Sequence, residues 1–313
     1  MKICIAGAGA MGGRFGYKLV ESGADVYFVD TWGPNVEAIR KDGLKVDEDG
    51  KKSVVNIPIY YPNEINQEGF RADLIILFVK AMQLDDMLMG IKALLTDSTY
   101  VLCLLNGIGH DSVIERHVPR NRILLGNTMW TAGMDGPGSV KLLGNGNIDL
   151  QNLEESGKEM ALRVADVLDK AGLEARFSQG VSHMIYKKAC VNGTVNGMCA
   201  LLECNIKAFG DTKSAEAIVR TIVGEFADVA AAEGVEMNRE EVVRHVLKTF
   251  DPGGVGLHYP SMYQDLVKNR RLTEIDYING AIVERGRQYG IATPYCTFLT
   301  QLVHAKEEVM GAQ

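Results

Sequence analysis

Short apolar runs alternate with amphipathic stretches through the first half of the chain. Strand-like runs occupy Lys2–Ala6, Asp25–Asp30 and the segments 72–81 and 100–109. After the first of these runs, the chain from Gly7 to Gly23 has the spacing of a helix with one apolar face. Because strands and helices alternate, we expect a parallel, doubly wound sheet and an α/β fold.

Residues 123–152 follow a different pattern. Two stretches, ILLGNTMWTAG and VKLLGNGNIDLQNL, contain strand-forming residues interrupted by glycine and asparagine. We expect them to form antiparallel strands added to the edge of the sheet. A helix over Gly157–Ala171 and a short strand over 174–178 are expected to complete this half.

Helical periodicity prevails from about residue 180 to the end of the sequence, with breaks at Gly210, Gly234, the Pro252–Gly254 stretch and Gly290. This change of period predicts two domains. The first, over residues 1–179, is expected to be the α/β domain, and the second, over 180–313, a mainly α-helical domain.

One predicted helix carries an unusual set of polar residues. In YKKACVNGTVNGMC (186–199), Lys188, Asn192 and Asn196 are spaced by four residues. Each step of four rotates by only about 40° around a helix, so the three side chains project from one face. Their neighbours are largely apolar, and unpaired polar groups are costly to bury, by about 1–3 kcal/mol each. A solvated lysine and helix-capping asparagines would explain each residue singly, but the aligned set favours a functional site.

Composition excludes several classes of function. The chain has 313 residues, 46% of them hydrophobic, and a net charge of −7 with a pI near 5.5, which argues against a nucleic-acid partner. The six cysteines show no metal-binding spacing, so we expect no metal and reduced thiols. The longest apolar run, Leu74–Val79, is too short to cross a membrane, and a strand begins at Lys2, so we expect a cytoplasmic protein.

A glycine-rich loop follows the first strand. Gly7, Gly9 and Gly12 form GxGxxG between a strand and a helix, with Ala10 and Met11 inside the motif. This context suits a dinucleotide: the glycines allow close approach of the backbone to pyrophosphate, and the helix N-terminus supplies N–H groups. We therefore expect the first domain to be a Rossmann dinucleotide-binding domain.

Asp30 ends the second strand, where a carboxylate accepts hydrogen bonds from both hydroxyls of the adenine ribose and repels a 2′-phosphate. The next residues, Thr31, Trp32 and Gly33, include no arginine to bind that phosphate. The alternative is an aspartate that only begins a turn. We expect NAD(H) as the preferred cofactor, with NADP(H) as a possible one.

Two further polar residues follow predicted strands. Lys80 comes after LIILFV, and Asn106 comes after VLCLL. Ligands of open α/β sheets bind beyond the carboxyl ends of the strands, so both are candidates for the cofactor or substrate. A surface lysine and a turn asparagine are the alternatives.

Several segments together resemble the ketopantoate reductase family. They are GAGAMG, VKAMQ, LLNGIG, KKACVNGTVN and PSMYQDLVKNRRLTEIDYINGA (260–281), in this order along nearly the whole chain. The last segment is far more specific than the glycine loop. The β-hydroxyacid dehydrogenases share a KxxxN helix after a Rossmann domain but lack this last segment, and we keep them as a remote alternative.

The resemblance implies a Rossmann domain, a helical domain and an active-site cleft between them. It also implies that Lys188 is the catalytic lysine and that Glu274 is a second active-site residue that also contacts the cofactor. The implied substrate-binding residues are Asn106, Asn192, Asn196 and Ser261. Lys80 and Asn106 are implied cofactor contacts. A homodimer is expected, although the apolar stretch Ala215–Ala232 fits either a dimer face or a core.

These residues predict the reduction of a 2-oxo acid. Lys188 as an ammonium ion would stabilise the charge that develops on the carbonyl oxygen and deliver a proton. Asn192 and Asn196 would orient the lysine and the substrate, and Ser261 would bind its carboxylate. Lys187, about 100° away around the helix, is expected to be the ordinary lysine of the pair.

Family members generally use NADPH and have a basic residue after the second strand, where this chain has Asp30. In this respect the chain is similar to the NAD-dependent D-2-hydroxyacid and D-mandelate dehydrogenase branch. We therefore expect reduction of a branched or aromatic 2-oxo acid to its (R)-2-hydroxy acid. Reduction of ketopantoate with NADPH is the second hypothesis, and a dinucleotide sensor without catalysis is the third.

Overall fold

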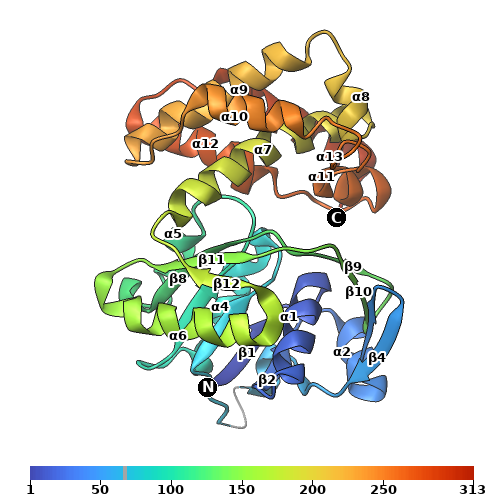
Figure 1. The fold of residues 1–313 in the computed structure, drawn as a ribbon, viewed down its shortest axis with the longest axis vertical. Helices are drawn as coiled ribbons and strands as arrows, with labels where there is room; N and C mark the ends of the chain where they lie inside the picture. The colour runs from blue at the N-terminus through green and yellow to red at the C-terminus, as the bar shows by residue number, and fades with distance from the viewer. Residues whose placement is uncertain (66–68) are drawn as a thin grey trace. The chain divides into compact units, whose positions relative to one another are not determined.

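The computed structural model describes residues 1–65 and 69–313, which form two compact units. The first comprises Met1–Leu105 and His110–Val181, and the second comprises Asn106–Gly109 and Ser182–Gln313. The first is an α/β unit and the second is mainly helical, as the sequence predicts for the fold class (Figure 1). The expected domain limit at 179/180 stays a prediction.

The α/β unit is built on a mostly parallel sheet. In spatial order its strands are β12 (Ala175–Phe177), β11 (Ile148–Asn152), β8 (Ile123–Thr128), β7 (Tyr100–Cys103), β6 (Leu74–Leu77), β1 (Lys2–Ala6), β2 (Asp25–Val29) and β5 (Ile59–Tyr60). The strands from β5 to β8 run parallel to one another. This order is that of a Rossmann sheet, with β1 at its centre.

Helices cover both faces of this sheet. The helices of the unit are α1 (Ala10–Glu21), α2 (Gly33–Asp42), α3 (Pro62–Ile65), α4 (Leu84–Gly90), α5 (His110–Ile114) and α6 (Lys158–Leu168). Apolar side chains of α1 and α6 share one core with the sheet, and those of α4 and α5 share another. Burial on both faces explains why β1 and β6 are almost entirely apolar.

The prediction for residues 123–152 was only partly right. β11 is antiparallel to β8 at the sheet edge as expected, but β8 itself pairs parallel with β7. The chain between them leaves this sheet and forms part of a second, smaller sheet. Its order is β4 (Lys51–Val55), β3 (Leu44–Glu48), β10 (Ser139–Leu143) and β9 (Thr131–Met134).

The second sheet packs against α1 through one face. Val140 of β10 lies so close to Gly13 that a Cβ there would be 2.7 Å from the valine side chain. Buried and exposed residues alternate along β10, as in a strand with one solvated face. Alternation of buried and exposed residues identifies such a strand but does not indicate which sheet it joins. For this reason β9 and β10 were wrongly expected at the edge of the main sheet.

The helical unit is organised around a long helix. Its helices are α7 (Val181–Leu202), α8 (Ile206–Gly210), α9 (Ala215–Ala232), α10 (Arg239–Lys248), α11 (Ser261–Tyr263), α12 (Ile275–Tyr289) and α13 (Pro294–Met310). Gly193 of α7 lies against Phe226 of α9, and Gly197 lies against Leu299 of α13. The apolar face of α9 belongs to the core of this unit, which resolves the open interpretation of Ala215–Ala232 in favour of the core.

Within the described residues, no helix combines the length and apolar character that a membrane span requires. The cysteines are free thiols, most of them buried in the two units.

Candidate active site

The glycine loop joins β1 to α1 in the α/β unit. At Gly9 a Cβ would meet no atom within 4 Å, so the loop leaves open space there. At Gly12 a Cβ would lie 1.8 Å from the carbonyl oxygen of Gly7, so no larger residue fits without moving the loop. The first feature offers room for a ligand, and the second keeps the helix close to the loop.

The N-terminus of α1 lies at this open space. The helix begins at Ala10, and its N-cap residue, Gly9, has no side chain to cap the first turn. N–H groups of the first turn, such as those of Ala10 and Met11, have no intrahelical partner, and the helix dipole is positive there. The open space and these donors fit the pyrophosphate of a dinucleotide.

Asp30 is held by backbone N–H groups of the glycine loop and of the segment that follows β2. Its carboxylate accepts hydrogen bonds from the N–H of Ala8 at 2.6 Å and from that of Trp32 at 2.8 Å. Asn35 donates to the carbonyl oxygen of Ala8 at 3.0 Å. Asp30 therefore fixes the glycine loop, a role that sequence reasoning missed. Each carboxylate oxygen has a second acceptor position, so the ribose contact stays a prediction.

Lys80 lies beyond the end of β6, immediately before the short helix η1 (Ala81–Gln83), and is half-buried. It belongs to the α/β unit with the glycine loop. Its predicted contact with the cofactor stays a prediction.

The polar face of α7 lies in the helical unit. Lys188 and Asn192 are half-buried, whereas Asn196 is only 5% exposed, and they occupy successive turns as predicted. The amide nitrogen of Asn196 lies 3.4 Å from the hydroxyl of Ser261, the first residue of α11. Two residues predicted to bind substrate, 65 positions apart in sequence, are thus in contact.

Lys188 has an unusual protonation equilibrium. Burial lowers its pKa to about 8, and this effect outweighs the negative charge of Glu274, which raises the pKa. The charge interaction brings together the two residues expected to be catalytic. A lysine with a pKa near 8 is largely an ammonium ion at neutral pH and releases its proton more readily than an ordinary lysine.

Lys187 occupies a different environment. Its ammonium group forms an ion pair with Glu241 of α10, with 2.8 Å between the charged atoms. The partner carboxylate is more than half exposed. Such a pair is typical of a protein surface, so the two adjacent lysines differ as the helical periodicity predicts.

Asn106 lies beyond the end of a strand as predicted, but the strand is shorter than expected and Asn106 does not belong to the α/β unit. We expected a strand over 100–109, but β7 ends at Cys103, and Asn106–Gly109 belongs to the helical unit. Within that unit, the N–H of Ile108 donates to the carbonyl oxygen of Tyr277 on α12 at 2.9 Å. The structure therefore places Asn106 in the same compact unit as Lys188.

Asn279 of α12 is a residue that sequence reasoning missed. It is fully buried, and its side-chain amide donates to the carbonyl oxygen of Gly193 at 3.0 Å, next to Asn192. This hydrogen bond holds α12 against α7 at a residue next to the polar face of α7. The residue is part of TEIDYING, but only the folded structure shows that it contacts a helix 86 positions away.

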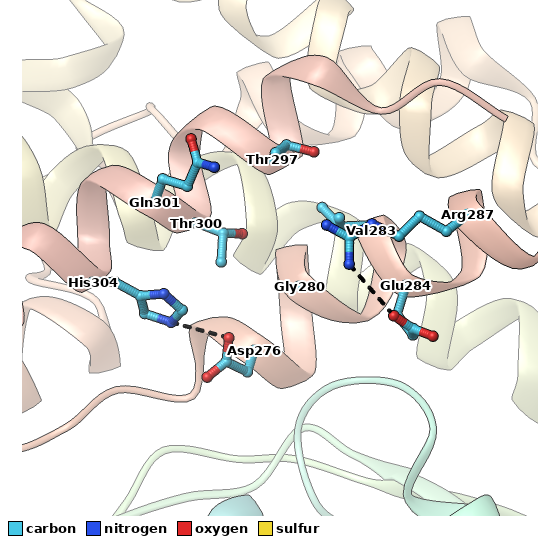
Figure 2. A pocket seen from close by; sticks show the side chains of 9 residues that line it. All are labelled: Asp276, Gly280, Val283, Glu284, Arg287, Thr297, Thr300, Gln301 and His304. Atoms are coloured by element: carbon cyan, nitrogen blue, oxygen red, sulfur yellow. Dashed lines mark ion pairs between the residues drawn. The ribbon is translucent and has the colours of Figure 1, made fainter.

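A groove of about 350 Å³ lies between α12 and α13 (Figure 2). It is lined by Asp276, Gly280, Val283, Glu284, Arg287, Thr297, Thr300, Gln301 and His304. Its charged side chains pair with each other: His304 lies 3.0 Å from Asp276, and Arg287 lies 3.7 Å from Glu284. None of the predicted site residues lines it, so we do not assign the chemistry to this groove.

Known proteins resemble the chain along its entire length. The family model for ketopantoate reductase PanE/ApbA matches residues 3–155, and the model for the C-terminal part of this family matches 181–307. The 2-dehydropantoate 2-reductases of Lactococcus lactis subsp. lactis (strain IL1403) and Streptococcus pyogenes serotype M1 are 53% and 48% identical, over all of both chains. A solved structure of D-mandelate dehydrogenase with NADH and anilino(oxo)acetate is 53% identical over all of both chains, with a TM-score of 0.96.

Proposed function

This chain belongs to the ketopantoate reductase family, and we propose that within it the chain is an NAD-dependent D-2-hydroxyacid dehydrogenase. It is an oxidoreductase that acts on the CH–OH group of 2-hydroxy acids, and it uses a nicotinamide dinucleotide. The finer proposal is that it reduces a branched or aromatic 2-oxo acid to the (R)-2-hydroxy acid.

The observation that carries the proposal is the charge interaction between Lys188 and Glu274, with Lys188 on the same face of α7 as two amides. When bound, reduced nicotinamide supplies a hydride to the carbonyl carbon of the substrate. Negative charge then develops on the carbonyl oxygen, and the ammonium group of Lys188 stabilises it and donates the proton. Because burial lowers the pKa of Lys188 to about 8, this donation is easier than from a solvated lysine.

The remaining predicted residues orient the substrate. The contact between Asn196 and Ser261 places an amide and a hydroxyl together, and we propose that they bind the substrate carboxylate. Asn192 lies one turn from Lys188 and is assigned to the carbonyl oxygen. Asn106, which the structure places in the same unit, is assigned to the substrate as well. Fixed donors of this kind hold the carbonyl in a reactive orientation.

Asp30 supports the preference for NADH. A carboxylate held at the end of β2 repels a 2′-phosphate, and Thr31 and Trp32 offer no positive charge to bind one. The D-mandelate dehydrogenase structure of 53% identity contains NADH and an oxo-acid analogue with an aromatic group. Asp30 and this related structure together support NADH as the cofactor and a bulky 2-oxo acid as the substrate.

Ketopantoate reduction is the second candidate. It is favoured by the name of the Lactococcus lactis relative, 2-dehydropantoate 2-reductase, which is 53% identical. Both reactions reduce the carbonyl group of a 2-oxo acid and require the same residues of α7. They differ in the substrate side chain and in the expected cofactor.

A panel of substrates separates the candidates. Absorbance of NADH and of NADPH is followed with phenylglyoxylate, phenylpyruvate, a branched 2-oxo acid and ketopantoate. We expect kcat/KM to be highest for an aromatic or branched acid, with NADH preferred by about 10- to 10³-fold over NADPH, since a few hydrogen bonds contribute only a few kcal/mol. A preference for ketopantoate with NADPH would favour the second candidate, and binding of NADH without its consumption would indicate a sensor.

We also propose a homodimer. Tyr295, Phe298, Leu302 and Val309 are exposed along the outer side of α13. Exposed apolar side chains in such number are typical of interaction surfaces. Sedimentation equilibrium tests this point: a dimer that dissociates in Phe298→Glu supports it, and a monomer at all concentrations contradicts it.

A further inference from the structure

The segment Asn106–Gly109 is attached to the helical unit through Ile108. This side chain is 6% exposed and lies in the apolar core that α7, α9, α12 and α13 form. The N–H of Ile108 also donates to the carbonyl oxygen of Tyr277. A buried side chain and a backbone hydrogen bond thus attach this segment to the helical unit.

The glycines on either side of Ile108 permit this attachment. Gly107 has φ of +103°, and a Cβ there would lie 2.3 Å from the carbonyl oxygen of Tyr277. Gly109 lies against the guanidinium group of Arg285, where a Cβ would be 3.0 Å from a nitrogen. Larger residues would push the segment away from α12 at both points.

Arg285 is itself held in place. Its Nε donates to the carboxylate of Glu233 at 2.7 Å, and both side chains are mostly buried. The same carboxylate accepts a hydrogen bond from the hydroxyl of Tyr186 on α7. The guanidinium that faces Gly109 is therefore linked to the helix that carries Lys188.

We propose that Ile108 and Arg285 are positioning residues for Asn106. They hold the segment Asn106–Gly109 on the helical unit, so the amide of Asn106 keeps a fixed place relative to Lys188 on α7. The inference rests on the proposed function, because it takes Asn106 as a substrate-binding residue. Glycine on both sides of Ile108 adds little backbone stiffness, so this attachment helps to determine where Asn106 lies.

A double-mutant cycle tests the positioning role. We expect Ile108→Ala to raise KM for the oxo acid or lower kcat by about 10-fold, as small displacements of substrate-binding groups do, while NADH affinity stays unchanged. In an Asn106→Ala background, the same change should add less than about twofold, because Ile108 acts through Asn106. If Ile108→Ala changed KM or kcat by the same factor with and without Asn106→Ala, the two residues would act independently and the proposal would be overturned.

Ile222→Ala is the matched control. Ile222 is also an isoleucine of the helical core, 3% exposed and located on α9. Its truncation should lower Tm as Ile108→Ala does, but leave KM unchanged at a temperature where both variants are folded. Equal changes in KM for both variants would show a general loss of stability and contradict a positioning role. Ile108→Val, which keeps most of the side chain, should restore most of the activity.

Arg285 is tested in the same way. Arg285→Leu should change KM and kcat in the direction of Ile108→Ala and lose its effect in the Asn106→Ala background. Arg287→Leu is the control, because Arg287 lies on the same helix and lines the groove between α12 and α13. An effect of Arg287→Leu as large as that of Arg285→Leu would contradict the assignment.

Hydrogen exchange tests the attachment without any assay of turnover. Destabilising the helical unit with Ile222→Ala should speed exchange of the Ile108 amide, because the segment opens with that unit. Destabilising the α/β sheet with Ile76→Ala, a fully buried residue of β6, should leave this amide protected. The opposite result would overturn the proposal. If the native enzyme reduces no 2-oxo acid, the proposed function fails, whereas exchange still decides whether the helical unit holds the segment.

Discussion

The glycine loop of the α/β unit and the polar face of α7 are suited to their proposed roles in opposite ways. The loop acts through what is missing: Gly9 leaves space, and the first turn of α1 has no side-chain cap. The face of α7 acts through what is present, a lysine and two amides in largely apolar surroundings. Adding atoms should therefore damage the loop, and removing them should damage the helix. The loop should govern cofactor affinity, and the helix should govern turnover.

The largest effect is expected on α7. Lys188→Ala removes the proposed proton donor and its positive charge, so kcat should fall by about 10²-fold or more, as is typical for lost acid catalysis and charge stabilisation. NADH affinity, measured by fluorescence titration, should change little. Lys187→Ala is the control, because this lysine pairs with Glu241 and should keep near-normal turnover. If Lys187→Ala lost most of its turnover while Lys188→Ala kept it, Lys187 and not Lys188 would be the catalytic lysine.

The loop should respond to added atoms. Gly12→Ala places a Cβ against the carbonyl oxygen of Gly7, so it should weaken NADH binding by about 10-fold or more and lower Tm, as overpacking does. Gly9→Ala meets no protein atom, so it should weaken NADH binding without lowering Tm. Titration and thermal unfolding of the two variants check this difference. Unchanged affinity in Gly9→Ala would contradict the assignment of this space to the cofactor.

Ser261 should have a smaller effect. Ser261→Ala removes one hydrogen bond worth about 1 kcal/mol, so KM for the oxo acid should rise by about fivefold with little change in NADH affinity. Ser214→Ala is the control, since this serine precedes α9 and makes no cap with its side chain. If Ser261→Ala weakens NADH and the oxo acid equally, the residue supports the fold of the unit rather than the substrate.

Glu274 should shift a pH dependence. Its negative charge raises the pKa of Lys188, so the neutral variant Glu274→Gln should lower that pKa further. Under the proposed mechanism, reduction requires the ammonium form of Lys188. The decline of activity on the alkaline side should therefore begin at lower pH in Glu274→Gln than in the native enzyme. Glu284→Gln, an exposed change on the same helix, should leave the profile in place. A shift toward higher pH in Glu274→Gln would have the wrong sign for this account.

The sequence predicted those features that depend on local pattern. Continuous apolar runs identified β1 and β6, and the 3.6-residue period placed Lys188, Asn192 and Asn196 on one face of α7. The sequence did not predict features that depend on pairing between distant segments. The alternation along β10 is the same whichever sheet the strand joins, so its place beside β3 was not predictable.

The site shows the same division between local and distant information. Asp30 was recognised from its position after β2, but its bond to the N–H of Ala8 depends on the folded loop. Asn106 was recognised from its position after an apolar run, but the contact of Ile108 with Tyr277 spans 169 positions of sequence. Residues that position others are invisible until distant parts of the chain are brought together.

The most direct test of the central claim is the pH dependence of kcat/KM for oxo-acid reduction in the native enzyme and in Lys188→Ala, measured from pH 6 to 10. The native enzyme should be nearly constant below about pH 8 and fall by about tenfold for each pH unit above it, because Lys188 loses its proton there. Lys188→Ala should be slow and lack this decline. A native profile without a decline near pH 8, or the same decline in Lys188→Ala, would contradict Lys188 as the proton donor.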